Sequence, residues 1–218
     1  MKFPNAYSGV KKIFSSEVLS IIAAVCLLLA SFFAVIMVEA ASEKSETGLL
    51  ASFSATGIFT LASGIVGIIA LVLLIIGVSA ASKDEPTFKT AFTFIIVNLL
   101  ASALALIPFS DVIKQIFNLA SNVAGIFAAF YIIYGIQALA VKCGDAGVEK
   151  KGKTVIALIL CTYIIALVAT ILGSFVVTGT AANVVSLVGA IVDIVRLVIY
   201  VVYLAAAKKM LANTPAEV

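Results

Sequence analysis

Long stretches without a charged side chain constrain this chain more than any other feature. No charge occurs between Thr47 and Ser82, or between Thr154 and Val192. A membrane-spanning helix needs about 20 consecutive apolar residues, so each stretch is long enough for at least one span. The chain is 63% hydrophobic and only 11% charged, whereas soluble domains are about 25% charged. The sequence therefore predicts an all-α, polytopic membrane protein.

Charged and turn-forming residues divide the apolar stretches into six spans. Pro108 ends one span because proline cannot continue a helix, and Thr178-Gly179-Thr180 is a turn signal inside the last long stretch. The predicted spans cover residues 18–38, 57–81, 90–107, 121–141, 154–177 and 183–207. Amphipathic helices at about 3–14 and 110–120 are expected to lie on the membrane surface. Together they form a single membrane domain over residues 1–218.

The first apolar stretch has a second interpretation. Val38-Glu39-Ala40 resembles the small-residue cleavage site of a signal peptide. A signal peptide, however, normally has an apolar segment of only about 7 to 15 residues. We therefore expect an uncleaved first span followed by a polar loop from Glu39 to Thr47, with cleavage as the alternative.

Basic residues fall almost entirely on one side of a six-span bundle. Only Lys44 and Lys114 fall on the other side. An excess of lysine marks the cytoplasmic side of a membrane protein, so both termini are predicted to be cytoplasmic and the protein to be multi-pass in the cell membrane. The eleven lysines on the cytoplasmic side are Lys2, Lys11, Lys12, Lys83, Lys89, Lys142, Lys150, Lys151, Lys153, Lys208 and Lys209.

The second, fourth and sixth spans end alike, each in two small or apolar residues followed by Lys83, Lys142 or Lys208. This similarity favours three helical hairpins of the same orientation, and parallel repeats of this kind occur in transporters. The alternative is that such endings arise by chance in apolar sequence of low complexity.

Asp193 and Arg196 are two charges deep inside the last predicted span. A charge at the bilayer centre costs about 2.5 to 3.5 kcal/mol on insertion scales. At a spacing of three residues the two side chains can reach each other. They belong to a stripe of small and polar residues that is expected to face protein. The other members of the stripe are Ser186, Gly189, Tyr200, Tyr203 and Ala207.

This pair has two interpretations. In the first, Arg196 engages an anionic group of a ligand and Asp193 orients it. In the second, the two residues form a static ion pair that fixes the register of the helix.

Uncharged polar side chains occur in other spans. Asn98 lies near the centre of the third span, and Gln137 shares a face with Tyr134 in the fourth. Together with Asp193 and Tyr200 they are candidates for one ligand-binding pocket at mid-depth, where transporter sites lie. The alternative is that several of them hydrogen-bond neighbouring helices, at about 0.6 kcal/mol each.

Small residues at four-residue spacing mark helix faces that can approach other helices closely. Thr60-x-x-x-Gly64 and Ala124-x-x-x-Ala128 are examples. These faces favour a compact bundle, and they also suit a homo-oligomer or a protein partner.

The loop before the fifth span matches the phosphate-binding pattern G-x-x-x-x-G-K-[ST], from Gly147 to Thr154. A true P-loop follows a strand in an α/β domain, whereas this segment lies between two spans. Nucleotide hydrolysis is therefore not expected. Lys150, Lys151 and Lys153 beside a helix N-terminus are expected instead to attract anionic lipid headgroups.

The sequence contains no histidine, which excludes histidine-dependent metal sites and catalytic dyads. Asp193 is the only acidic residue deep in a predicted span, so a paired-aspartate membrane protease is not expected either. We predict no enzyme activity, cofactor, metal or nucleic-acid partner. Two function classes remain. One is a transporter or the substrate-binding membrane subunit of a transport system. The other is a non-transporting scaffold, regulator or immunity-type accessory protein.

Overall fold

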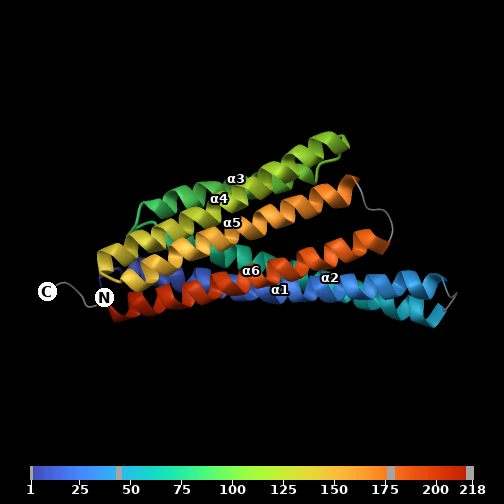
Figure 1. Cartoon of the computed structure of the whole chain (residues 1–218), viewed down its shortest axis with the longest axis horizontal. Coiled ribbons are helices and arrows are strands. Elements are labelled where there is room, and N and C mark those ends of the chain that lie inside the picture. The colour runs from blue at the N-terminus through green and yellow to red at the C-terminus, as the bar shows by residue number, and fades with distance from the viewer. Residues whose placement is uncertain (1, 43–45, 176–179, 215–218) are drawn as a thin grey trace. The chain divides into compact units, whose positions relative to one another are not determined.

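The computed structural model describes residues 2–42, 46–175 and 180–214, and within these ranges every regular element is an α-helix (Figure 1). The all-α prediction is confirmed. The helices are α1 (Pro4–Ser42), α2 (Glu46–Ala81), α3 (Thr87–Ala105), α4 (Asp111–Cys143), α5 (Ala146–Phe175) and α6 (Thr180–Asn213).

Five stretches of these helices are long and apolar enough to cross a membrane, which makes the chain a multi-pass membrane protein. The span predicted at about 154–177 falls in α5 and extends beyond the described residues. The six-span count, the cytoplasmic termini and the three hairpins therefore stay predictions. The five stretches are Pro4–Ile36, Phe53–Ala81, Thr87–Ala105, Val112–Cys143 and Gly189–Asn213.

The helices are longer than the predicted spans. The segment at 3–14 and the span at 18–38 are parts of one helix, α1, and the segment at 110–120 forms the start of α4. Most of the loop predicted from Glu39 to Thr47 is helical, because α1 continues through Ser42 and α2 begins at Glu46. The rest of that predicted loop, residues 43–45, lies outside the described residues. Polar residues alone do not end a helix. No proline lies between residues 14 and 18 or between residues 39 and 47, so a helix can continue into these polar segments. A membrane-surface location for 3–14 and 110–120 stays a prediction.

The chain divides into two compact units. The first comprises Met1–Phe14, Leu73–Ile156 and Tyr203–Val218, and the second comprises Ser15–Val72 and Ala157–Val202. Helices α1, α2, α5 and α6 contribute residues to both units, whereas α3 and α4 belong to the first alone.

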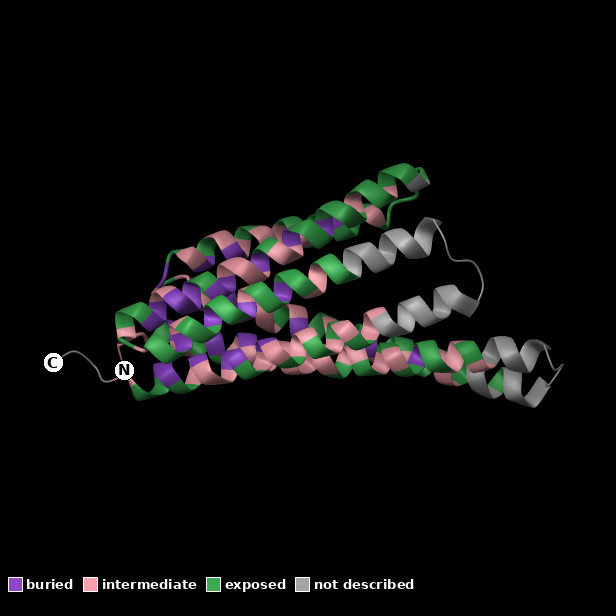
Figure 2. Ribbon diagram, viewed as in Figure 1, coloured by how far each residue is buried: buried purple, intermediate pink, exposed green. Residues whose placement is uncertain are grey.

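Helices α3 and α4 pack against each other in the first unit. The ring of Phe94 on α3 stacks on Phe127 and Tyr131 of α4, with centroids 5.1 and 5.5 Å apart. Nearer the cytoplasmic end predicted for these helices, Phe88 and Ile136 are fully buried. Figure 2 marks the buried residues of the chain in purple. Aromatic stacking and aliphatic burial thus join α3 and α4 between Phe94 and the predicted cytoplasmic end of the hairpin.

Two glycines allow α1 and α2 to approach closely in the first unit. A Cβ atom at Gly9 would lie 2.5 Å from the carbonyl oxygen of Gly77 and 2.6 Å from the nitrogen of Ala81. A Cβ atom at Gly77 would lie 2.8 Å from the carbonyl oxygen of Gly9. These separations are too short for any side chain, so the contact between the two main chains requires glycine at both positions.

In the second unit, serine hydroxyls join the same two helices. Ser16 Oγ donates to the carbonyl oxygen of Ala70 at 2.6 Å, and Ser63 Oγ donates to that of Ala23 at 3.0 Å. Such bonds satisfy polar groups that hydrocarbon cannot solvate.

The turn between α2 and α3 connects to α1 through Asp84. Its carboxylate accepts hydrogen bonds from the main-chain N–H of Ala6 and from Asn5 Nδ2, both at 2.8 Å. Asp84 therefore caps the first turn of α1 from a distant part of the chain, in the way that an N-cap side chain does locally.

The next residue, Glu85, connects the same turn to the end of α4. Its carboxylate accepts hydrogen bonds from Lys142 Nζ at 2.6 Å and from Thr87 Oγ1 at 2.7 Å. Burial acts to raise the pKa of Glu85, but the hydrogen bonds from Lys142 and Thr87 outweigh it and leave the pKa below its ordinary value.

Replacing Glu85 with glutamine should destabilise the first unit by about 1 kcal/mol, because Lys142 loses its charged partner. Because the folded-state pKa is lowered, the contribution is present above the ordinary value of 4.5 and is lost as the pH falls through the lowered pKa. The melting temperatures of the parent and the variant in detergent should therefore differ at pH 7 and converge below pH 4.5.

Glu149→Gln is the matched control. Its partner Lys153 is exposed, so the substitution should change the melting temperature little. Equal effects of Glu85→Gln and Glu149→Gln would contradict a special role for the α2–α3 turn.

Replacing Gly9 with alanine should lower stability by about 1 to 3 kcal/mol, because the added methyl group forces α1 away from α2. In contrast, Gly67→Ala should be neutral or slightly stabilising, since a Cβ there meets no atom within 4 Å and alanine favours a helix by about 1 kcal/mol over glycine. Thermal unfolding in detergent measures both, and an undiminished melting temperature for Gly9→Ala would contradict the close contact.

Candidate functional site

Ionisable side chains from three helices gather within the second unit. On α6, Arg196 Nη2 lies 3.3 Å from Asp193 Oδ1. The same guanidinium lies over the ring of Tyr163 on α5, 4.6 Å from its centroid. Glu17 on α1 is close enough to interact electrostatically with Arg196. We call Glu17, Tyr163, Asp193 and Arg196 the charged cluster.

The arginine of this cluster lies deep along α6. Lys208 near the end of the helix is roughly 18 Å from Arg196, since an α-helix rises about 1.5 Å per residue. The hydrocarbon core is about 30 Å thick, so Arg196 falls near its middle if Lys208 marks the boundary. The side chain of Arg196 is 21% exposed and that of Asp193 is 53% exposed. Arg196 Nε is buried and has no hydrogen-bond partner among the described residues.

Sequence reasoning missed Glu17. It began the first span at residue 18 and treated the residues before it as a surface segment. In the structure α1 continues through this point, and its apolar stretch Pro4–Ile36 includes Glu17. Pro4–Ile36 has 33 residues, more than one span needs, so the expectation that Asp193 is the only acidic residue deep in a span stays a prediction. The absence of any helix-breaking residue between Phe14 and Val18 was the available signal.

Glu17 changes the charge balance at Arg196. Two carboxylates and one guanidinium have a net charge of −1 when all are ionised, and hydrocarbon strongly penalises an uncompensated charge. The sequence suggested that Arg196 engages an anionic group. The guanidinium is already paired with Asp193, and Glu17 lies within electrostatic range of it, so the cluster is better suited to a cation or a proton.

Asn98 joins two helices of the first unit. Its Nδ2 donates to the carbonyl oxygen of Ser121 at 2.7 Å and to Ser121 Oγ at 3.0 Å, and Ser102 Oγ lies 2.7 Å from the same hydroxyl. These bonds agree with the interpretation that Asn98 hydrogen-bonds a neighbouring helix.

The other predicted site residues have different surroundings. Gln137 is buried, and its Nε2 has no hydrogen-bond partner in the described part of the chain. Tyr134 is 49% exposed, whereas Tyr200 is buried.

The six candidates do not all belong to one unit. Asn98, Tyr134 and Gln137 lie in the first unit, and the other three, Asp193, Arg196 and Tyr200, lie in the second. The structure brings Asp193 and Arg196 together. Convergence of all six on one pocket stays a prediction.

No family model matches the chain, and no characterised protein or solved structure is significantly similar to it. Among the described residues, no group of three or more His, Cys, Asp or Glu side chains is arranged to hold a metal ion. The charged cluster is the candidate functional site in the second unit.

Replacing Arg196 with glutamine should lower the melting temperature more than Glu17→Gln does, because it leaves two carboxylates without a cation. The double variant Glu17→Gln, Arg196→Gln should be more stable than the sum of the single effects predicts. A double-mutant cycle should give a coupling of at least about 0.5 kcal/mol. Additive effects would contradict an interaction between Glu17 and Arg196, and Lys89→Gln on exposed α3 surface is the control for loss of one positive charge.

Proposed function

We propose that the protein is a small membrane transporter, or the substrate-binding membrane subunit of a transport system, whose charged cluster takes a cationic ligand or a proton. The observation that supports this proposal is the gathering of Glu17, Asp193 and Arg196 inside apolar helices of one unit. Ionisable residues in such segments commonly mark substrate or ion pathways.

Each residue of the cluster has a distinct role in this proposal. Glu17 and Asp193 supply the oxygen ligands for a cation or accept a proton. Arg196 competes with the ligand for Asp193, from which it lies 3.3 Å. Tyr163 supports the guanidinium through a cation–π contact. In the ligand-free arrangement Arg196 pairs with Asp193. In the ligand-bound arrangement the ligand takes Asp193, and Arg196 keeps its contact with Tyr163.

A second candidate function is a non-transporting scaffold, regulator or immunity-type accessory protein. The observation in its favour is the small-residue face of α2. Thr60 and Gly64 are exposed, and a Cβ at Gly57 or Gly64 would meet no atom of the described chain within 4 Å. A helix of a partner, or of a second copy, fits such a face closely.

The proposal includes a cell-membrane location with both termini cytoplasmic, which the distribution of lysines supports. It also includes an attraction between anionic lipids and Lys150, Lys151 and Lys153. Lys153 Nζ additionally contacts Glu149 Oε1 at 2.7 Å.

Native mass spectrometry of protein extracted gently from its own membrane separates the two functions. A transporter of a cationic solute should retain a small molecule whose occupancy falls in Glu17→Gln and in Asp193→Asn, but not in the matched control Glu149→Gln. A stoichiometric protein partner without a small ligand would instead favour the accessory function, unless that partner carries an ATPase.

If the ligand is a proton, proteoliposomes provide the test. The parent protein should dissipate an imposed pH gradient faster than protein-free vesicles, and Glu17→Gln should abolish the difference while Glu149→Gln retains it. Gradient decay that is the same in all three proteins would contradict proton binding at Glu17.

A further inference from the structure

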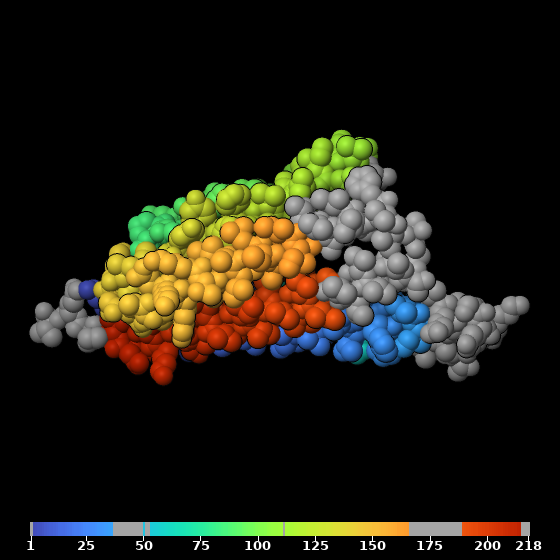
Figure 3. Space-filling view, in the orientation of Figure 1, coloured from blue at the N-terminus to red at the C-terminus, as the bar shows by residue number. Residues whose placement is uncertain are grey.

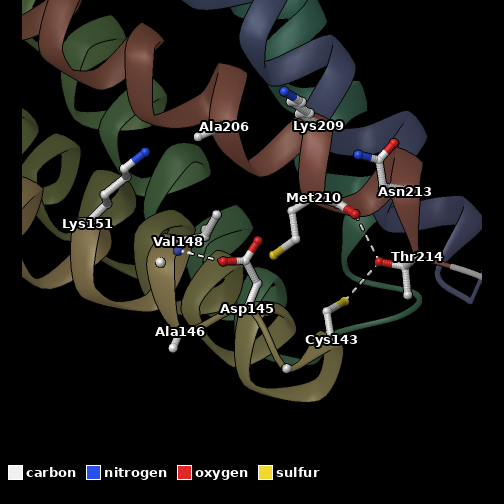
Figure 4. A pocket seen from close by; sticks show the side chains of 12 residues that line it. Cys143, Asp145, Ala146, Val148, Lys151, Ala206, Lys209, Met210, Asn213 and Thr214 are labelled. Atoms are coloured by element: carbon white, nitrogen blue, oxygen red, sulfur yellow. Dashed lines mark hydrogen bonds between the residues drawn. The ribbon is translucent and has the colours of Figure 1, made fainter.

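The first unit contains an open pocket of about 570 Å³ where α4 ends, α5 begins and α6 ends (Figure 4). The first turns of α5, in yellow and orange, lie beside the last turns of α6, in red (Figure 3). The residues that matter for its chemistry are Asp145, Val148, Lys151, Lys209, Met210 and Asn213.

Local structure fixes the walls of this pocket. Gly144 ends α4 with φ of 72°, in the left-handed region that glycine favours. The chain can therefore enter α5 almost at once. Asp145 Oδ1 accepts a hydrogen bond from the main-chain N–H of Val148 at 3.0 Å and so caps the start of α5. On the opposite wall, Thr214 Oγ1 donates to the carbonyl oxygen of Met210 at 2.9 Å.

The pocket is apolar at its base and basic at its rim. Val148 and Met210 are buried, whereas Lys151 and Lys209 are exposed. In Figure 4 the two lysine side chains lie on either side of Ala206. Their two positive charges exceed the single negative charge of Asp145, whose carboxylate already accepts the Val148 N–H. An anion with several acceptor oxygens suits this arrangement better than a cation.

The pocket lies at the boundary between apolar and polar sequence. The apolar part of α4 ends at Lys142 and that of α6 ends at Lys208, and both positions are within about one turn of pocket residues. A headgroup bound at the rim would leave its acyl chains beside apolar helix surface. The lysine distribution predicts that this end is cytoplasmic, where anionic lipids are enriched.

We propose that this pocket binds the phosphate of an anionic phospholipid headgroup, with Lys151 and Lys209 as the cationic groups and Asn213 as a hydrogen-bond donor. This site is more specific than a general attraction to the loop lysines. Of Lys150, Lys151 and Lys153 only Lys151 lines the pocket, and Lys209 joins it from α6. The proposal does not depend on transport by the charged cluster.

The chain supplies a matched control for each lysine. Lys150 is exposed like Lys151 but does not line the pocket. Lys208 precedes Lys209, but its Nζ lies over the ring of Phe14, 4.4 Å from the centroid. The double variants Lys151→Gln, Lys209→Gln and Lys150→Gln, Lys208→Gln therefore remove the same charge from the same region.

Native mass spectrometry on protein reconstituted with phosphatidylglycerol and phosphatidylcholine tests the site. The parent should retain phosphatidylglycerol in preference to phosphatidylcholine. Lys151→Gln, Lys209→Gln should reduce the retained phosphatidylglycerol about tenfold. Lys150→Gln, Lys208→Gln removes only general attraction and should reduce it much less, and the conservative Lys151→Arg, Lys209→Arg should retain it. The melting temperature of each variant without lipid reports whether it folds.

Equal losses in the two glutamine double variants would overturn the proposal in favour of an effect of net charge. Equal retention of both lipids by the parent would overturn it as well. Undiminished retention of phosphatidylglycerol in Lys151→Gln, Lys209→Gln, with folding intact, would also overturn it. A further outcome is that inorganic phosphate raises the melting temperature of the parent in neutral lipid, that this rise requires Lys151 and Lys209, and that phosphatidylglycerol is not retained. The ligand would then be soluble phosphate, and the lipid proposal would be overturned.

Discussion

Hydrocarbon cannot hydrogen-bond a polypeptide, and the rest of this structure depends on that constraint. Every main-chain N–H and C=O group within the bilayer core needs a partner in the chain, and a helix supplies one locally. The long uncharged stretches therefore form helices and continue through short polar segments such as Ser15-Ser16-Glu17. Polar side chains within the helices obey the same constraint: Ser16 bonds to the carbonyl oxygen of Ala70, and Asn98 bonds to Ser121.

Acidic residues in the first unit act chiefly at helix ends. Asp84 and Glu85 are neighbours in one turn, yet Asp84 caps α1 and Glu85 holds the end of α4 through Lys142. Asp145 caps α5 in the same way, one residue after the glycine that ends α4. The close contact of Gly9 with Gly77 lies next to the α2–α3 turn, whose Asp84 caps α1. Short helix connections and capped ends together leave a small, basic pocket, which is the basis of the proposed lipid site.

The charged cluster in the second unit has the opposite arrangement, because its four residues lie along the helices and not at their ends. Arg196 pairs with Asp193 on the same helix and lies over Tyr163 of α5, and Glu17 of α1 is within electrostatic range of it. A static pair would need only the Asp193–Arg196 contact on α6. The additional carboxylate makes the balance of charge unfavourable until a cation or proton joins it, and this imbalance is the physical basis of the proposed transport function.

The sequence by itself determined the membrane class, the helical fold and most helix positions, and it singled out Asp193 and Arg196 as a pair, because apolar length and isolated charges are local properties of the chain. It misjudged helix ends, since polar residues without a proline do not stop a helix. Only the tertiary structure decided which distant side chains lie near one another: Glu17 within electrostatic range of Arg196, Asp84 at the start of α1, and Lys151 with Lys209 around one pocket. These contacts depend on which helices pack together and on how each helix is rotated about its axis. A helix that is apolar on all sides has no polar face to indicate its neighbours or its rotation, so the sequence does not predict either.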